Sequence, residues 1–241
     1  MLNSEQYTSI FEPYTAFQLG EIAKYSRDMV HYTSASNALR IIRSRRITLR
    51  NASLMNDFSE INHGERCLIS GWNSVHGLGL TPHEGRLFQL LGRVSPTIFP
   101  AIEQGYNRHL NIRKADTFIL SLAEHNDQAE GSIGKLSMWR AYGGRTNVAI
   151  VVHPGFLFSE SETSVYSAPV IYSSAQEFPD LYFSRLVDSI ERNFEKVSSL
   201  DRDYIVQCVW SSFNTMALAT KHPGFFEEKE WRLIYVSHPG R

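Results

Sequence analysis

The segment TFILSLAE, residues 117–124, alternates bulky apolar side chains with smaller or polar ones. Because successive side chains of a strand point to opposite faces of a sheet, this pattern predicts a β-strand whose less bulky face carries Ser121. Other stretches are rich in strand-forming residues, which predicts further strands at residues 28–33, 47–53, 147–154, 164–174 and 230–237. We expect residues 147–154, a continuous apolar run, to form a central strand, and Pro169 to mark an edge strand or a bulge.

Segments with helical spacing separate these strands, so we expect an α+β fold. One helix follows the first strand from Ser34, and two amphipathic helices are expected at residues 186–197 and 205–216. The pattern over residues 58–112 is helical but interrupted by glycine and proline, which predicts an insertion of several short helices. With 241 residues and 42% hydrophobic composition the chain can form one large core, and we expect a single domain over residues 1–241.

Charge and cysteine content narrow the possible classes of protein. A net charge of −1 gives no overall attraction to nucleic acid or to an anionic membrane, so such a contact must come from a local patch. Cys67 and Cys208 lie far apart without metal-ligand spacing, which predicts two buried thiols, no zinc site and a reducing compartment. The chain has neither a basic region followed by an apolar run at its start nor a stretch that could cross a bilayer. We therefore expect a soluble, cytoplasmic protein that binds no membrane.

Near the end of the chain, the segment FFEEKEWRLIYV places acids at the start of a predicted strand. If residues 228–236 are extended, Glu228 and Glu230 lie on one face, about 7 Å apart. Lys229 and Trp231 then lie on the other face. One interpretation is that these charges protect a strand end against edge pairing. The other is that one acid points into a cleft, where it stabilises developing positive charge and binds a sugar hydroxyl group.

Three other segments contain candidate binding residues. VHYTS ends the first predicted strand at a helix N-terminus, where free backbone N–H groups bind anions or amides, and His31 is either part of that site or a structural histidine. SMWRAYGG places Trp139 and Tyr142 on one helix face, where they either cover a flat ring or pack in the core. Asn56 and Asp57 follow the second predicted strand and form either a turn or helix cap or part of a site.

Taken in order, these segments resemble a bacterial family known only as a domain of unknown function. The motifs are HYTS before ALRIIRS, then ITLRNASLMNDFSE, FILSLAE, SMWRAYGG and EEKEWRLIYV, and the resemblance spans about residues 30–236, with gaps at 62–112 and 175–222. At its N-terminal end that family is similar in turn to the ADP-ribosyltransferase superfamily, in particular to toxin-like members that modify nucleic acid. Their first strand carries a His-containing HxT-type motif. The resemblance implies a split mixed or antiparallel sheet core with inserted helices, with NAD as a substrate and no metal.

The same resemblance implies roles for residues at the start of the chain. His31 would bind the ribose or the carboxamide region of NAD. Thr33 or Ser34 and nearby groups, including Tyr32, would assist it. Asn56 completes this set of candidate NAD-binding residues.

Further roles follow for the aromatic and acidic residues. Tyr142, or else Trp139, would stack on nicotinamide. Glu230 would bind the 2′-hydroxyl group of the nicotinamide ribose while Glu228 positions the acceptor nucleophile, and the reverse assignment stays open. The middle motif of the superfamily, a Tyr or Ser that follows a strand, fits both Tyr142 and Ser121, and the sequence does not choose between them.

The only basic cluster of the sequence lies beside HYTS and consists of Arg40, Arg43, Arg45, Arg46 and Arg50. Arginines there would hold the pyrophosphate of NAD through bidentate contacts or bind a nucleic-acid backbone, and a solvated helix face is the alternative. Arg43, Arg46 and Arg50 are the candidate substrate-binding residues.

The function implied by the resemblance is NAD-dependent ADP-ribosylation of a macromolecule by a toxin or phage-defence effector. We expect RNA or DNA as the acceptor before protein, and an antitoxin or defence-system protein as a further partner. One alternative is an NAD glycohydrolase, in which water replaces the acceptor. The other is a non-enzymatic nucleotide- or partner-binding module. The chain lacks GxSxG, HExxH and GxxxxGKS/T, so hydrolase, zinc-protease and phosphate-loop chemistries lack their usual motifs.

Overall fold

The computed structural model describes residues 1–241 except for 55–57, 74–81, 127–129, 143–145, 159–164 and 238–241. Its strands are β1 (Asp28–Ser34), β2 (Arg50–Asn51), β3 (Thr117–His125), β4 (Asn147–Val152), β5 (Val165–Pro169), β6 (Ile171–Tyr172), β7 (Thr220–Lys221) and β8 (Glu230–Val236). The main sheet has the order β4-β1-β3-β8-β5, with β2 as a further partner of β3, and its pairings are antiparallel. β6 and β7 form a separate parallel pair. The expected α+β class with an antiparallel sheet is confirmed.

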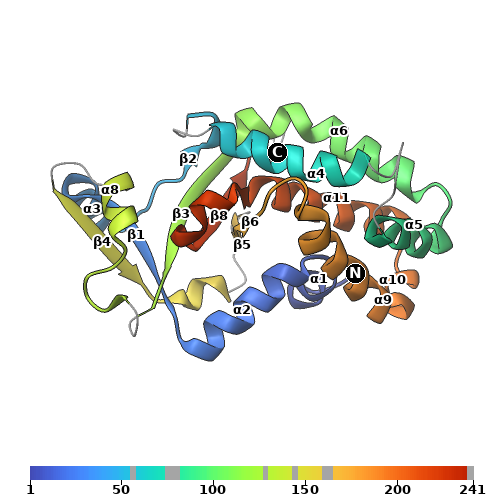
Figure 1. Ribbon diagram of the computed structural model, residues 1–241, viewed down its shortest axis with the longest axis horizontal. Coiled ribbons are helices and arrows are strands. Elements are labelled where there is room, and N and C mark those ends of the chain that lie inside the picture. Colours follow the sequence, from blue (N-terminus) through green and yellow to red (C-terminus); the bar gives the residue numbers. More distant parts are fainter. Residues whose placement is uncertain (55–57, 74–81, 127–129, 143–145, 159–164, 238–241) are drawn as a thin grey trace.

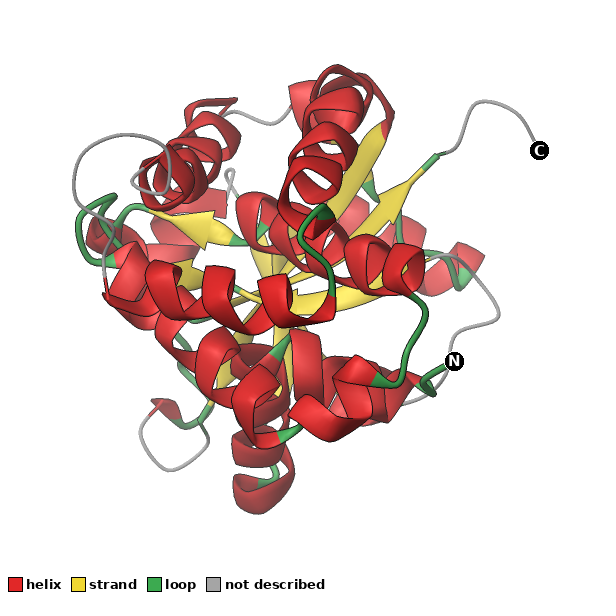
Figure 2. Ribbon diagram, turned by 90° about the vertical axis from the view of Figure 1, so that its right-hand side faces the viewer, coloured by secondary structure: helices red, strands yellow, loops and turns green. Residues whose placement is uncertain are grey.

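Helices surround the sheet and extend far beyond one of its ends (Figure 1). They are α1 (Ser4–Phe11), α2 (Pro13–Tyr25), α3 (Ala35–Ser44), α4 (Phe58–Asn73), α5 (Pro82–Val94), α6 (Ile98–Asp116), α8 (Leu136–Tyr142), α9 (Ser184–Arg192), α10 (Phe194–Ser198) and α11 (Arg202–Leu218). Figure 1 shows α3 and α8 beside β4 and β1 at one end, and α5, α9 and α10 at the other. Seen from that other end, helices cover much of the sheet (Figure 2). In the described part of the chain, no helix combines the length and the apolar character that a membrane span requires.

The largest hydrophobic core lies within the helical part of the molecule. Apolar residues of α1, α4, α5, α6, α9 and α11 meet there, and α11 is buried from Ser212 to Leu218 without interruption. Cys67 and Cys208 belong to this core as free thiols, as expected, and burial raises the pKa of each to about 11. A smaller core on one face of the sheet contains Trp231.

The structure corrects three expectations about the elements. The strand expected at 47–53 is reduced to Arg50–Asn51, and a 3₁₀ turn, η1 (Ala52–Leu54), follows it. β4 is an edge strand and not a central one, with Val151 57% exposed, so its apolar run does not reflect burial on both faces. The helices at 58–112 are long, because Pro96 lies between α5 and α6 while Pro100 falls in the first turn of α6, where proline is tolerated.

Other expectations about strands and helices are confirmed, and one part of the fold was not predicted from the sequence. Pro169 ends the edge strand β5, which suits a residue that cannot donate to a sheet ladder. Residues 186–197 and 205–216 are helical, although the first of these ranges divides at Asn193 into α9 and α10. The N-terminal helices α1 and α2 were not expected from the sequence.

The main sheet is split along one edge of β3. β1 pairs with the C-terminal end of β3 up to the pair Val30–Ala123. β2 pairs with the N-terminal half of β3, at Ile119. Between these contacts, in the described residues, Leu120–Leu122 has no strand partner on that edge, because β1 continues along β4 alone. On its other edge the same stretch pairs with β8, with Ser121 opposite Arg232. The split therefore leaves an opening next to the first residues of β8.

A buried acid between α1 and α2 makes stability depend on pH. Glu12 is 7% exposed, and the Tyr7 hydroxyl donates a hydrogen bond to its Oε1 at 3.2 Å. Burial raises the pKa of the Glu12 carboxyl from 4.5 to about 7, and the bond from Tyr7 offsets part of that rise. Because the folded-state pKa is the higher one, this group's stabilisation is complete below pH 4.5 and is lost as pH rises to about 7, a change of about 3 kcal/mol.

We therefore expect Glu12→Gln to flatten the pH dependence of the free energy of unfolding between pH 4.5 and 7. At pH 8 the variant should be more stable than wild type by up to about 3 kcal/mol, since no carboxylate is buried. Urea unfolding at pH 4, 6 and 8 measures this. Glu5→Gln, which changes an exposed acid of α1, is the matched control. Parallel pH curves for Glu12→Gln and wild type would contradict the assignment.

Candidate functional site

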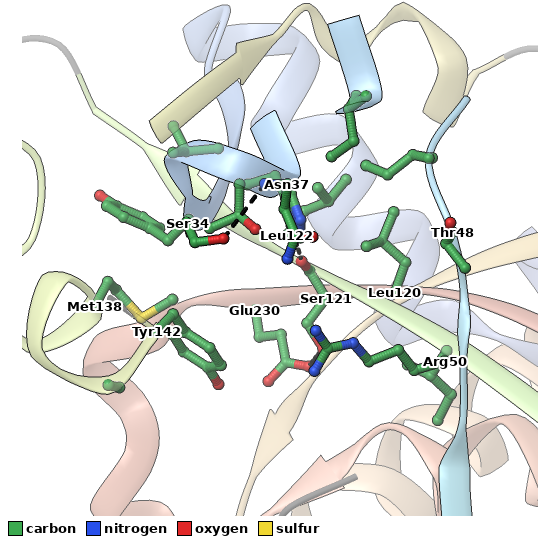
Figure 3. Close-up of a pocket in the computed structure, with 18 of the residues that line it drawn as sticks. Ser34, Asn37, Thr48, Arg50, Leu120, Ser121, Leu122, Met138, Tyr142 and Glu230 are labelled. Atoms are coloured by element: carbon green, nitrogen blue, oxygen red, sulfur yellow. Dashed lines mark hydrogen bonds between the residues drawn. The ribbon is translucent and has the colours of Figure 1, made fainter. Parts of the chain in front are cut away.

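A cleft of about 320 Å³ opens at the split in the sheet. Residues of β1, α3, the segment 47–50, β3 and α8 line it, together with Glu228 and Glu230. Figure 3 shows Glu230 and Ser121 in the middle of the opening, with Tyr142 on one side and Arg50 on the other. This volume is at the lower end of the range of about 300–1,000 Å³ for small-molecule sites.

Glu230 lies at the floor of this cleft and is 4% exposed. Its Oε1 accepts hydrogen bonds from Ser121 Oγ and from Arg232 Nε, the latter at 2.8 Å. Its Oε2 accepts a hydrogen bond from Lys221 Nζ at 2.9 Å. Ser121 reaches Glu230 because it pairs with Arg232 in the β3–β8 ladder, which places its side chain on the same face of the sheet.

The charges around Glu230 decide its protonation state. Burial acts to raise the pKa of the carboxyl, but the positive charges of Arg232 and Lys221 outweigh it and lower the pKa from 4.5 to about 2. The side chain is therefore a carboxylate at neutral pH. Because two cations lie beside it, its main capacity is to accept and orient a hydrogen bond from a ligand.

The structure corrects the expected geometry of the acidic segment. Pro223–Glu228 forms a 3₁₀ turn, η4, which ends at Lys229 in the left-handed conformation, with a φ of 44°. β8 thus begins only at Glu230, and Glu228 does not share its strand face. Both acids nevertheless line the cleft, and Glu228 Oε2 lies 2.7 Å from Lys221 Nζ. The burial of Glu230 rules out the interpretation that it is a solvated charge at a strand end.

His31 lines the cleft on β1, half-buried. Its Nδ1 lies 3.3 Å from the carbonyl oxygen of Ser121, in the unpaired stretch of β3. Burial lowers the pKa of the imidazole, and the charge of Arg50 lowers it further. A neutral ring that donates from Nδ1 to a carbonyl keeps Nε2 as an acceptor. His31 therefore helps to hold the split strands and offers one acceptor to a ligand.

The N-terminus of α3 faces the same cleft. Ser34 is its N-cap and accepts a hydrogen bond from the Asn37 backbone N–H at 3.3 Å. Thr33, Ser34 and Asn37 all line the cleft. The expected junction of strand and helix is therefore present at the opening.

The structure separates the two aromatic candidates on α8. Tyr142 lines the cleft and is 44% exposed, so its ring is available to a ligand. Trp139 does not line it: its indole N–H donates to the Ile133 carbonyl at 2.7 Å, and its ring packs edge-on against Tyr32 at 4.9 Å. Tyr32 contributes to the lining but is 6% exposed, and its hydroxyl accepts the Lys135 N–H at 3.0 Å. Trp139 and Tyr32 are thus packing residues, and Tyr142 fits the ring-covering role.

Only part of the arginine cluster lies in the cleft. Arg40 and Arg50 line it, and Arg40 Nη1 donates to Thr48 Oγ1 at 3.4 Å. Arg43 and Arg46 are exposed and lie outside the lining, which corrects their expected place in the substrate cleft. Of the three arginines chosen from the sequence, Arg50 alone lies in the cleft.

Two residues of the site were not among those chosen from the sequence, and one chosen residue lies outside the part of the chain that the structure describes. Arg232, two residues after Glu230 on the same strand face, could have been found from the strand period. Lys221 gives no local signal, since it meets the acids only through tertiary structure. Asn56 lies outside the described residues. Within the part that is described, no group of three or more His, Cys, Asp or Glu side chains is arranged to hold a metal ion.

Comparison with protein families gives one match. Residues 138–233 match a family described as "Protein of unknown function (DUF2971)". The match covers α8 to β8, and so includes Tyr142, Lys221 and both acids, whereas His31 and Ser121 lie outside it. It bears out the expected resemblance to a domain of unknown function over this part of the chain. No curated protein and no solved structure gave a match.

Proposed function

We propose that the protein is an NAD-dependent ADP-ribosyltransferase whose active site is the cleft at the split in the sheet. One observation carries the proposal: His31, Ser121 and Glu230, from strands far apart in the sequence, line one opening beside the exposed ring of Tyr142. That set contains an ionised acid, a neutral imidazole and an aromatic ring. The split antiparallel sheet also agrees with the core that the resemblance implies.

The proposed reaction breaks the bond between nicotinamide and C1′ of the ribose. The electron pair of that bond goes to the nicotinamide nitrogen, and positive charge develops on the sugar, as in glycoside cleavage. Glu230 accepts a hydrogen bond from the 2′-hydroxyl group, because Oε2 has one described donor, Lys221, and a carboxylate oxygen accepts two. Ser121 fixes the other oxygen of the same carboxylate. The acceptor then bonds to C1′ and releases its proton to water, with Glu228 orienting the acceptor.

The other residues of the cleft suit the remaining parts of NAD. Tyr142 covers the nicotinamide ring, and His31 Nε2 accepts a hydrogen bond from the carboxamide or the ribose. Arg40 and Arg50 bind the pyrophosphate, since guanidinium groups pair with phosphate through two parallel hydrogen bonds. Positioning of this kind accounts for much of the rate enhancement when a reaction needs little covalent help from the protein.

Incubation with NAD labelled in its adenylate part tests the proposal. We expect label on macromolecules of a cell extract, together with release of nicotinamide. Release of free ADP-ribose without labelled macromolecules would select NAD hydrolysis. Binding of NAD without turnover would select the non-enzymatic module. No binding and no turnover would reject all three.

For the acceptor we propose single-stranded nucleic acid, RNA or DNA, before protein. The chain from residue 29 to residue 56 contains five arginines and no acid, although the protein as a whole has a net charge of −1. Arg43, Arg45 and Arg46 are exposed at the end of α3, and none forms an ion pair with a described residue. Phe226 of η4 is 62% exposed two residues before Glu228, which gives a base a ring to stack on. Phosphate contacts and stacking together suit a single strand.

The double variant Arg43→Gln/Arg46→Gln should weaken binding of a fluorescent 20-nucleotide single strand. Each lost phosphate contact lowers the slope of log K against log salt by about 0.7, so the slope should fall by about 1.4 and Kd should rise about tenfold at 0.15 M salt. Fluorescence anisotropy at several salt concentrations measures both. Arg192→Gln/Lys196→Gln removes the same charge at the other end of the molecule and should leave both unchanged (Figure 1). Equal losses in the two variants would mean that only overall charge matters.

A transferase that modifies the RNA or DNA of its own cell would impair growth. We therefore propose a toxin or phage-defence effector acting in the cytoplasm, with an antitoxin or defence-system protein that restrains it. Growth of cells that express the wild type, with and without added candidate partners, tests this. Unimpaired growth with fully folded protein would contradict it.

A further inference from the structure

Lys221 is a buried cation behind the cleft, shared by both acids. It is 1% exposed, and its Nζ lies 2.7 Å from Glu228 Oε2 and 2.9 Å from Glu230 Oε2. The same Nζ lies 5.1 Å from the centre of the Phe225 ring, so it also contacts η4. Lys221 is not part of the cleft lining. It therefore acts on a ligand only through the acids that it holds.

Lys221 is held rigidly by elements other than those that carry the acids. β7 follows directly from α11 and pairs with β6, and the Ser173 N–H donates to the Lys221 carbonyl at 3.0 Å. From β6, the Tyr172 hydroxyl accepts the backbone N–H of Glu230 at 2.8 Å. The β6–β7 pair thus fixes the first residue of β8 through its backbone and through its side chain. A mobile surface lysine could not supply such a fixed contact.

The two cations of the cluster have different roles. Arg232 contacts Glu230 Oε1 and the carbonyl oxygen of Leu218, which places it toward the end of α11. Lys221 contacts Oε2, which has no other donor among the described residues, and it also reaches Glu228. Removal of Lys221 would take away the one cation that, among the described residues, contacts both Glu228 and Glu230.

We propose that Lys221 is the positioning residue of this site: it fixes Glu228 and Glu230 relative to each other and keeps Oε2 of Glu230 directed at the cleft. The role rests on the proposed function, because it serves the acid that would bind the ribose. The arrangement of charges itself does not require NAD. Its test can therefore be made without turnover.

Titration of the Glu230 carboxyl by carbon NMR, assigned through Glu230→Gln, makes that test. Lys221→Met removes the charge and keeps the length of the side chain, and it should raise the Glu230 pKa by about 1–3 units. Lys221→Arg keeps the charge and should show less than half of that shift. The acidic limb of the pH–rate profile should move upward with the Glu230 pKa. An unchanged titration in folded Lys221→Met would overturn the proposal.

A measurement on the wild type keeps the proposal testable if Lys221→Met does not fold. The Lys221 ammonium protons should exchange slowly with water at pH 7 and show contacts to both acid side chains in nitrogen-edited spectra. Exchange as fast as that of the exposed Lys24 would overturn the proposal. Lys221→Met can shift the Glu230 pKa as expected while the wild type transfers no label from NAD. That combination would reject the transferase and support the positioning role of Lys221.

Discussion

Glu230→Gln is expected to reduce the transfer of label from NAD by about 10²–10³-fold. A preorganised hydrogen-bonding group that acts on the transition state is worth that much when it is removed. Glutamine keeps the size of the side chain, but its oxygen accepts a hydrogen bond far more weakly than a carboxylate does. Initial rates with labelled NAD measure the loss. In cells, the same change should relieve any growth defect caused by the wild type.

Two controls separate this loss from damage to the fold. Glu227→Gln changes the exposed acid of the same turn and should leave the rate unchanged. Because Glu230→Gln leaves Arg232 and Lys221 with less compensation, some loss of stability is expected, and far-UV circular dichroism and NAD binding must show that the variant is folded at the assay temperature. A wild-type rate for folded Glu230→Gln would remove Glu230 from the mechanism, and a matching loss in Glu227→Gln would show that the effect is not specific.

Strands with a full local pattern could be predicted, and strands defined by their neighbours could not. TFILSLAE carries its alternation within itself, so β3 and the face of Ser121 follow from eight residues. The apolar run of β4 is compatible with either an edge or a centre, because that choice depends on which strands lie beside it. β2 is two residues long and exists through its pairing with Ile119, so local propensity over 47–53 overstates it.

The same distinction holds within the site. Glu230, His31 and Tyr142 stood out because each lies in a recognisable motif, and all three line one cleft. Lys221 could not be found from a motif, because it is placed beside the acids by the parallel pair of β6 and β7. No sequence pattern predicts that pair. Spacing did not distinguish Trp139 from Tyr142. The structure does, because Trp139 packs against Tyr32 while Tyr142 lines the cleft.

Gly64→Ala should destabilise the protein by more than about 3 kcal/mol, which for a chain of this size corresponds to a fall in Tm of roughly 10 °C. Gly64 lies in α4 where that helix crosses α11, and a Cβ added there would stand 2.1 Å from the carbonyl oxygen of Ala217. That atom belongs to the backbone and cannot rotate away, so the helices must separate. α11 leads directly to Lys221, and its last carbonyl, that of Leu218, accepts a hydrogen bond from Arg232. The variant should therefore also lose transferase activity at temperatures where it is still folded.

Gly20→Ala is the matched control for this prediction. Gly20 is an exposed helical residue of α2, and nothing lies within 4 Å of the position of an added Cβ. Alanine favours a helix more than glycine does, by up to about 1 kcal/mol, so this variant should be as stable as the wild type or slightly more stable. Thermal unfolding followed by circular dichroism compares the two. If both variants melt together, the close contact of α4 and α11 does not exist.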